Sequence, residues 1–290
     1  LSAAGGIRSE VVVVEPTGAD TFVACRHQGA ELSVVFRERH DFAPGSHIHL
    51  QPDLQRAHVF DAASGRLLHW LRGEGGKLLT VALSSLGIVA AAGEGKRVYL
   101  WDAKDGRALA KLPVPTSSLF ESAVSPSGEL LATAGVGGDL YVWDLRSRAL
   151  SQRLQGHSGD VFSLRWHRDS RRLLTASADQ SAVIWDARRG SILQRFTGHT
   201  GSVRMANLSA DERRVLTASE DGTAHLWEAE TGELLGSYAS LNGGLVSAHF
   251  TQDGEFLVTT SSDRSILVYP ASDTQLLRAA EARLAAQAEH

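Results

Sequence analysis

Residues 156–186 read GHSGDVFSLRWHRDSRRLLTASADQSAVIWD, and residues 198–228 read GHTGSVRMANLSADERRVLTASEDGTAHLWE. The two stretches align without a gap at an offset of 42 residues, so the chain contains two consecutive copies of one unit. Within each copy, short apolar runs alternate with Gly, Asp and Ser, which favour turns. This pattern predicts short β-strands joined by tight turns.

The Trp near the end of each copy recurs along nearly the whole chain or is replaced by another apolar residue. Steps of 41 to 46 residues connect seven such positions: Val14, Phe60, Trp101, Trp143, Trp185, Trp227 and Tyr269. A period of about 40–45 residues that opens with Gly-His and closes with Trp-Asp is the signature of the WD40 repeat. The sequence therefore resembles the WD40 repeat family over residues 1–280, and its central copies are similar to bacterial WD40 repeats.

The resemblance implies an all-β fold, a seven-bladed WD40 β-propeller whose blades are four-stranded antiparallel sheets. We name the strands of a blade a to d from the centre to the rim. In this frame, residues 1–6, 11–15 and 20–25 correspond to strands b, c and d. The first blade would therefore lack its inner strand at the N-terminus.

The second blade would follow the same frame. Its four strands would come from residues 32–36, 46–50, 57–61 and 66–71. We expect residues 1–280 to form one propeller domain, with a last strand or the start of a helix near residues 275–278. Residues 281–290 are rich in Ala and Glu and contain no β-branched residue, so we expect a C-terminal helix or a disordered tail.

The composition argues against some classes of partner. The net charge is −4, so no basic field draws the chain to nucleic acid or to a membrane surface. The single cysteine, Cys25, excludes an internal disulfide and suits a reducing compartment. No apolar run reaches the roughly 18 residues of a membrane span, and no secretory signal is visible. We expect a cytoplasmic protein.

The resemblance also implies a hydrogen-bonded set of four side chains in a blade: a His after strand d, a Ser or Thr of strand b, an Asp of the b–c turn and the Trp of strand c. A buried indole N–H needs an acceptor, and an Asp can fix its own turn. Two blades contain all four: His157, Ser177, Asp179 and Trp185 in one, and His199, Ser219, Asp221 and Trp227 in the next. We expect these residues to be structural rather than catalytic.

The chain contains no sequence motif of an enzyme. It has no phosphate-binding loop of the Walker or dinucleotide type, no G-x-S-x-G elbow and no H-E-x-x-H helix. We therefore expect a protein that is not an enzyme and that uses no cofactor and no metal.

Five histidines crowd into one degenerate repeat: His40, His47, His49, His58 and His69. Imidazoles on neighbouring strands could ligate a transition metal, but no Cys or nearby carboxylate completes a site. We favour a partly solvated polar face over a metal site here.

The residues that open strand a of each blade would surround the mouth of the central channel. In register with Phe162, this ring consists of Leu78, Phe120, Phe162, Arg204 and Val246, and the surrounding loops add Asp160 and Arg264. Aromatic residues and Arg are enriched in interface hot spots, so we expect a partner-binding surface. Alternatively, Phe120 and Phe162 pack against each other and seal the channel.

These features favour a non-catalytic scaffold or adaptor that binds a protein or peptide partner on the face formed by the d–a and b–c loops. An alternative is a sensor or regulatory domain of a larger signalling enzyme, an NTPase or a kinase, whose catalytic part lies upstream of Leu1. The mid-blade start favours this alternative and a chain that is part of a larger polypeptide or complex. An enzymatic propeller is less favoured, because the ring is largely apolar.

Overall fold

The computed structural model describes residues 7–17, 20–27, 30–36, 47–50, 56–60, 67–115 and 118–271, with side chains from Leu68 onward. Contacts divide the chain into two units, Leu1–Leu54 and Gln55–His290. This division differs from the single propeller domain expected over residues 1–280. The expected tail at residues 281–290 and the expected element near residues 275–278 lie outside the described residues.

The first unit contains one antiparallel sheet with the order β3-β2-β1-β4. Its strands are β1 (Ile7–Thr17), β2 (Asp20–His27), β3 (Ala30–Phe36) and β4 (His47–Leu50). The repeat frame assigned residues 32–36 and 46–50 to a following blade, and this assignment is wrong. Only two residues separate β1 from β2 and β2 from β3, and such short connections favour hairpins between consecutive strands.

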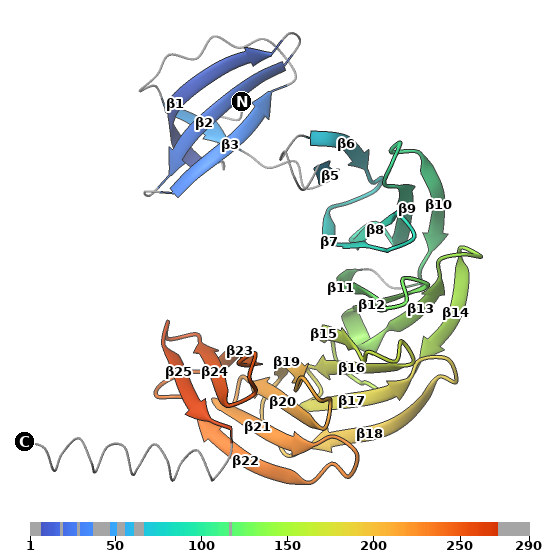
Figure 1. Cartoon of the computed structure of the whole chain (residues 1–290), viewed down its shortest axis with the longest axis vertical. Helices are drawn as coiled ribbons and strands as arrows, with labels where there is room; N and C mark the ends of the chain where they lie inside the picture. Colours follow the sequence, from blue (N-terminus) through green and yellow to red (C-terminus); the bar gives the residue numbers. More distant parts are fainter. Residues whose placement is uncertain are drawn as a thin grey trace, which may run out of the picture. The chain divides into compact units, whose positions relative to one another are not determined.

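The second unit repeats one four-stranded antiparallel sheet four times, with strands in chain order (Figure 1). The first two sheets are β7 (Leu78–Leu83), β8 (Ile88–Gly93), β9 (Arg97–Asp102) and β10 (Ala108–Pro113), and then β11 (Leu119–Val124), β12 (Leu130–Gly135), β13 (Leu140–Asp144) and β14 (Ala149–Leu154). The next two are β15 (Val161–Trp166), β16 (Arg172–Ser177), β17 (Ser181–Asp186) and β18 (Ser191–Thr197), and then β19 (Val203–Leu208), β20 (Arg214–Ser219), β21 (Thr223–Glu228) and β22 (Leu234–Ala239).

Two smaller sheets complete the described part of this unit. One pairs β5 (Arg56–Phe60) with β6 (Leu67–Arg72), and the other holds β23 (Leu245–Phe250), β24 (Phe256–Ser261) and β25 (Ile266–Pro270). A short 3-10 turn, η1 (Val136–Gly138), follows β12. Among the described residues, no helix is long and apolar enough to cross a membrane. The sheets match propeller blades, whereas the expected number of seven blades stays a prediction.

The hydrophobic core lies between consecutive sheets. In the four-stranded sheets of this unit, strands b and c are mostly buried on both faces, and β12, for example, is buried at every residue. Leu140 and Val142 of one sheet pack with Leu173 and Trp185 of the next, and equivalent clusters join the other neighbouring four-stranded sheets. Each sheet is therefore held by its neighbours in the chain, as in other repeat proteins.

The β5–β6 pair packs on the β7–β10 sheet in the way strands c and d of a blade would. Leu71 of β6 is buried against Val89, Tyr99 and Trp101. Leu112 of β10 makes the equivalent contact with the following sheet. The expected strands at residues 57–61 and 66–71 are confirmed by β5 and β6.

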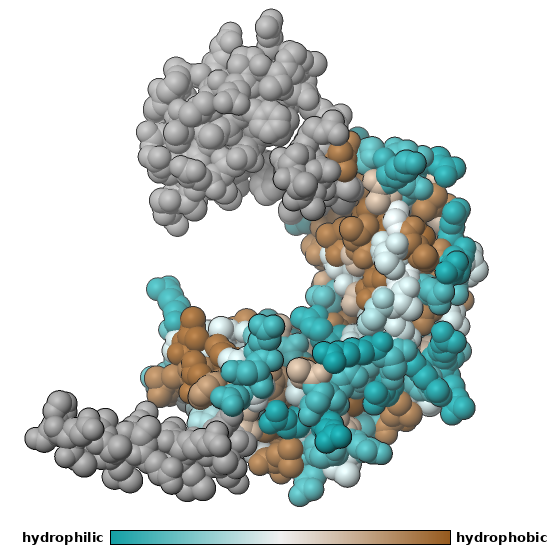
Figure 2. Space-filling model, in the orientation of Figure 1, coloured by the Kyte–Doolittle hydropathy of each residue, from teal (hydrophilic) through white to brown (hydrophobic). Residues whose placement is uncertain are grey.

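Apolar side chains stay exposed on β7 and on β25, the first and the last strand of the sheets from β7 to β25. Val81 of β7 is 59% exposed, although Leu164 at the equivalent place on β15 is buried. Ile266 and Val268 of β25 are 67% and 60% exposed. Figure 2 shows the resulting hydrophobic surface over β24 and β25. The described sheets therefore cover each other but not the outer faces of β7 and β25.

Candidate functional site

A β-bulge directly follows the first paired residue in five inner strands of the second unit: β7, β11, β15, β19 and β23. In β15, for example, pairing passes from Val161 to Ser163 and skips Phe162. The skipped residues are Leu79, Phe120, Phe162, Arg204 and Val246. A bulge leaves one residue outside the ladder and re-aims its side chain, so these five side chains share one position in the fold.

Four of the five ring residues expected from the sequence occupy this position. Leu78 does not, because it pairs with Gly93 as Leu119 pairs with Gly135, and Leu79 takes its place. The reason is the spacing: β7 and β11 are 41 residues apart at these pairs, one fewer than in the central repeats. A sequence count of 42 therefore selects the wrong residue at this blade.

Phe120, Phe162 and Arg204 form a continuous stack across β11, β15 and β19, which we call the aromatic–arginine row. The two phenyl rings stack with centroids 6.5 Å apart and planes 20° from parallel. The Arg204 guanidinium carbon lies 4.4 Å from the Phe162 centroid, a cation–π contact. Both rings are half-buried, whereas the Arg204 side chain is 41% exposed. The stack therefore keeps a water-facing side.

Exposed apolar residues extend the row at both ends. Leu79 is 44% exposed and Val246 is 52% exposed. Arg204 Nε lies 3.3 Å from Glu220 Oε1 on the neighbouring turn. The site thus consists of apolar surface around a single cation, which is partly balanced by one carboxylate.

The two loop residues predicted for this face differ in their roles. Asp160 is half-buried, and its Oδ1 accepts the backbone N–H of Gly137 at 2.8 Å, so it ties two neighbouring loops together. Arg264 is exposed and sits at φ 72° in the β24–β25 turn. No hydrogen bond or ion pair within the described residues joins Arg264 to the row.

The first hydrogen-bonded set runs through a threonine that the sequence analysis did not select. Trp185 Nε1 donates to Thr175 Oγ1 at 2.9 Å, and the same oxygen lies 2.7 Å from His157 Nε2. His157 Nδ1 lies 2.8 Å from Asp179 Oδ2. Ser177 stands outside this chain, because its hydroxyl donates to the Gly159 carbonyl at 3.0 Å.

The second set has the same geometry. Trp227 Nε1 donates to Thr217 Oγ1 at 2.9 Å, His199 Nε2 lies 2.8 Å from that oxygen, and His199 Nδ1 lies 2.9 Å from Asp221 Oδ2. Ser219 donates to Gly201 instead. A Thr ten residues before the Trp marker is the signal that could have identified the acceptor, since Thr133 accepts from Trp143 in the same way.

The electrostatics of these sets fit a structural role. Burial raises the pKa of Asp179, but hydrogen bonds from His157 and Ser181 lower it by more. The pKa of Asp179 therefore lies well below the ordinary carboxyl value. Burial likewise raises the pKa of Asp221, and hydrogen bonds from Thr223, Thr200 and His199 lower it below that value. Each His–Asp pair is largely enclosed, and its polar atoms are engaged with one another.

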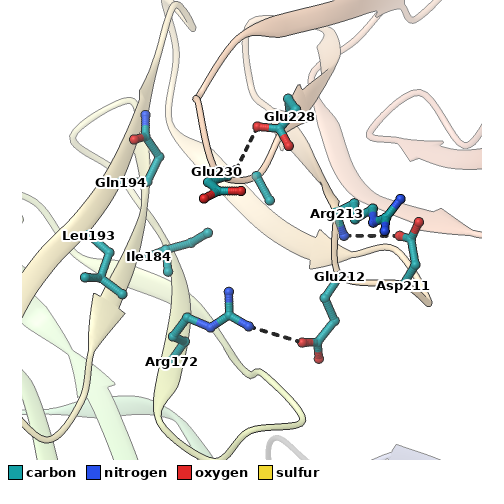
Figure 3. Close-up of a pocket in the computed structure, with 10 residues that line it drawn as sticks. Arg172, Ile184, Leu193, Gln194, Asp211, Glu212, Arg213, Glu228 and Glu230 are labelled. Atoms are coloured by element: carbon teal, nitrogen blue, oxygen red, sulfur yellow. Dashed lines mark hydrogen bonds and ion pairs between the residues drawn. The ribbon is translucent and has the colours of Figure 1, made fainter.

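A pocket of about 500 Å³ lies between the β15–β18 and β19–β22 sheets (Figure 3). Arg172 and Glu212 face each other across it, with Nη2 and Oε2 3.7 Å apart. Asp211 and Glu228 accept backbone N–H groups of their own turns. The pocket shares no residue with the aromatic–arginine row, and its charged groups mainly fix the local turns.

The histidine cluster can be followed only at His69, whose Nε2 lies 2.8 Å from the Lys104 carbonyl oxygen. His40 lies outside the described residues, and so do the side chains of His47, His49 and His58. Within the residues whose side chains are described, no group of three or more His, Cys, Asp or Glu residues could hold a metal ion.

The four-stranded sheets repeat along the chain, and in two of them a Trp–Thr–His–Asp network joins neighbouring strands; these features define a protein built from propeller-type blades. The family described as "WD domain, G-beta repeat" matches residues 107–144, 148–186, 190–228 and 232–269, together more than half of the chain. The chain belongs to the WD40 repeat family.

The N-terminal residues match a second family, described as "TOBE domain", over residues 1–60. An "Uncharacterized ABC transporter ATP-binding protein y4oS" of Sinorhizobium fredii is 47% identical over 60 residues, which cover 21% of this chain and 16% of that protein. A "Putative ATP-binding protein" of Brucella abortus is 38% identical over 60 residues, 21% of this chain and 17% of that protein. The chain thus spans about a sixth of the curated relatives it matches.

Among solved structures, the chain is similar to the computationally designed Ika8 protein. The TM-score is 0.68 with 17% sequence identity, and the match covers 90% of this chain and 70% of the other. At this identity the likeness supports the fold alone. The TOBE match also reaches past the division at Leu54, so β5 lies in the TOBE match while its partner β6 packs on the repeats.

Proposed function

We propose that the WD40 repeats form a non-catalytic protein-interaction scaffold that holds its partner at the aromatic–arginine row. WD40 repeats in general suggest such a role. The observation that carries the site is the stack of Phe120, Phe162 and Arg204, which combines half-buried aromatic rings with a cation, residue types that are enriched at protein interfaces. Leu79, Val246 and Asp160 belong to the same face.

The proposal assigns no catalytic role to the histidines and aspartates. This is supported by the burial of the His157 and His199 side chains, each of which hydrogen-bonds with an aspartate, Asp179 or Asp221. A general base would need an open path to a substrate proton. We also propose a cytoplasmic location and a role in signalling, with neither cofactor nor nucleic acid.

A second candidate is a regulatory module of a larger ATP-hydrolysing protein. The observation in its favour is the resemblance of residues 1–60 to ABC transporter ATP-binding proteins. Of the NTPase and kinase alternatives raised by the sequence, this resemblance favours the NTPase. In this proposal the repeats would bring a partner to a transport ATPase, so the two candidates share the same docking site.

The test is quantitative capture of crosslinked partners from source-cell extract. The double variant Phe162→Ala with Arg204→Glu should lose the partner bands that the unmodified chain captures. The matched control is Leu193→Ala with Arg188→Glu, an exposed apolar–arginine pair on β18 and the preceding turn. Full capture by the double variant, with an unchanged melting temperature, would show that the partner binds outside the aromatic–arginine row. Copurification of a transport ATPase would favour the second candidate.

A further inference from the structure

The row has the spacing and the charge to select one kind of peptide. We propose that it binds an extended acidic segment, whose apolar side chain lies on the phenyl rings and whose carboxylate, two residues along, meets Arg204. This inference rests on the proposed function and adds the chemistry of the partner.

The spacing of the row matches the repeat of an extended peptide. The Phe120 and Phe162 centroids are 6.5 Å apart. An extended chain advances about 3.2–3.4 Å per residue and places alternate side chains on one face, which gives roughly 6.4–6.8 Å between them. A peptide that crosses from β11 to β15 can therefore place successive same-face side chains on the two phenyl rings, and Arg204 is the next member of the row.

The charge of the row selects an acid at one position. Arg204 is the one charged side chain among the five bulge residues. Its Nε lies 3.3 Å from Glu220 Oε1, and within the described residues neither Nη group makes a hydrogen bond. The phenyl face of Phe162 holds the guanidinium plane in place. A planar guanidinium with two free N–H groups is suited to a bidentate carboxylate.

The residues beside Arg204 argue against a nucleic acid. Glu220 lies beside Arg204, and Glu121 follows Phe120 on β11, 3.9 Å from Arg165. The exposed Leu79 and Val246 extend the apolar surface rather than a basic one. A phosphate backbone would meet these carboxylates repeatedly, whereas a peptide with a single acid would meet only the guanidinium.

The experiment measures fluorescence anisotropy of labelled peptides with the full chain. The probe is Leu-Thr-Asp-Thr-Leu between Gly-Ser flanks. One comparison peptide replaces Asp by Lys, and another has the order Leu-Asp-Thr-Thr-Leu, which turns the acid to the opposite face. We expect the probe to bind at least about tenfold more tightly than either, because only the probe can place a carboxylate against the Arg204 guanidinium.

Two variants separate charge from apolar contact. Arg204→Gln should remove the preference for Asp over Lys at the central position, and Phe162→Ala should weaken all the peptides alike. Arg107→Gln, an exposed arginine in the β9–β10 turn, is the control and should leave every affinity unchanged. Equal binding of the Asp and Lys peptides, or a full Asp preference in Arg204→Gln, would overturn the proposal.

The outcome also distinguishes this inference from the proposed function. If the row variants lose the native partner but no acidic peptide is preferred, the scaffold stands and this inference falls. If the row variants retain both the partner and the peptide, both proposals fall. Tighter binding of an unstructured deoxythymidine oligonucleotide than of the Asp peptide would assign the row to nucleic acid and overturn the inference.

Discussion

The imidazole rings of His199 and His225 stack face to face, with centroids 3.9 Å apart and planes 11° from parallel. His225 occupies a strand position at which the preceding blades carry Val183 and Tyr141. Burial first, and the neighbouring His199 second, lower the pKa of His225 to about 4. Burial also lowers the pKa of His199, against the opposing effect of Asp221. Folding therefore makes His225 and His199 harder to protonate than they are in the unfolded chain.

The stack predicts acid sensitivity of the repeats. Because the folded pKa of His225 lies below its unfolded value of 6.5, the unfolded chain binds the proton more readily. Stability should fall as pH drops from about 6.5 towards 4, by on the order of 2 kcal/mol between pH 7 and pH 5. His225→Val should flatten this dependence in urea unfolding. Equal slopes for His225→Val and the unmodified chain would contradict the prediction.

Thr175 should be more important for stability than its neighbour Ser177. Thr175→Val removes the acceptor of Trp185 and the partner of His157 at once, so it should cost about 2–4 kcal/mol. Ser177→Ala loses one turn hydrogen bond and should cost about 1 kcal/mol. Denaturant midpoints of the two variants provide the comparison, and a cost for Ser177→Ala as large as that for Thr175→Val would refute the assigned network.

The carboxylate of Asp179 should be needed at neutral pH and less so in acid. Asp179→Asn weakens contacts with His157, Ser181 and the Ser158 backbone, and we expect a loss of roughly 3 kcal/mol at pH 7. Since its folded pKa lies below the ordinary value of 3.8, the stabilisation is present above pH 3.8 and fades as pH falls below it. The gap in stability between the unmodified chain and Asp179→Asn should therefore narrow in acid, and a constant gap would count against an ionised Asp179 carboxylate in the folded chain.

Two adjacent glycines allow a controlled test of close packing. Gly137 and Gly138 both have positive φ, 71° and 83°. A Cβ at Gly137 would meet open space, whereas one at Gly138 would collide with the His157 carbonyl. Gly137→Ala should cost about 1 kcal/mol from strain alone, and Gly138→Ala about 1–3 kcal/mol more from the collision. Similar melting temperatures for the two variants would show that the loop near His157 moves to accommodate the added Cβ.

The sequence was sufficient to predict the blades in which the period is regular. Trp101, Trp143, Trp185 and Trp227 each lie on the expected strand c, because a fixed period and a buried indole constrain each other. The row of Phe120, Phe162 and Arg204 was also found, because the bulge keeps the same distance from each marker. Leu79 was missed, because one blade is a residue shorter.

The N-terminal sheet was not predicted, because an apolar strand does not encode its partners. Val14 fits the repeat period, but β1 around it pairs with β2 and β4 in a sheet of its own. Pairing there follows short connections rather than the 42-residue period. Thr175 was missed for a different reason. Ser177 lies close to Asp179 in sequence, whereas the hydrogen bond from Trp185 reaches Thr175 on the neighbouring strand.

The β5–β6 pair lies across the end of the TOBE match. The TOBE match ends at residue 60, inside the hairpin, and the buried Leu71 of its second strand belongs to the core of the first full blade. A truncation after residue 60 would remove β5 and leave β6 without its hydrogen-bonded partner strand. Because Leu71 of β6 packs with Trp101, the loss of β5 would weaken a strand that contributes to the core of the first full blade.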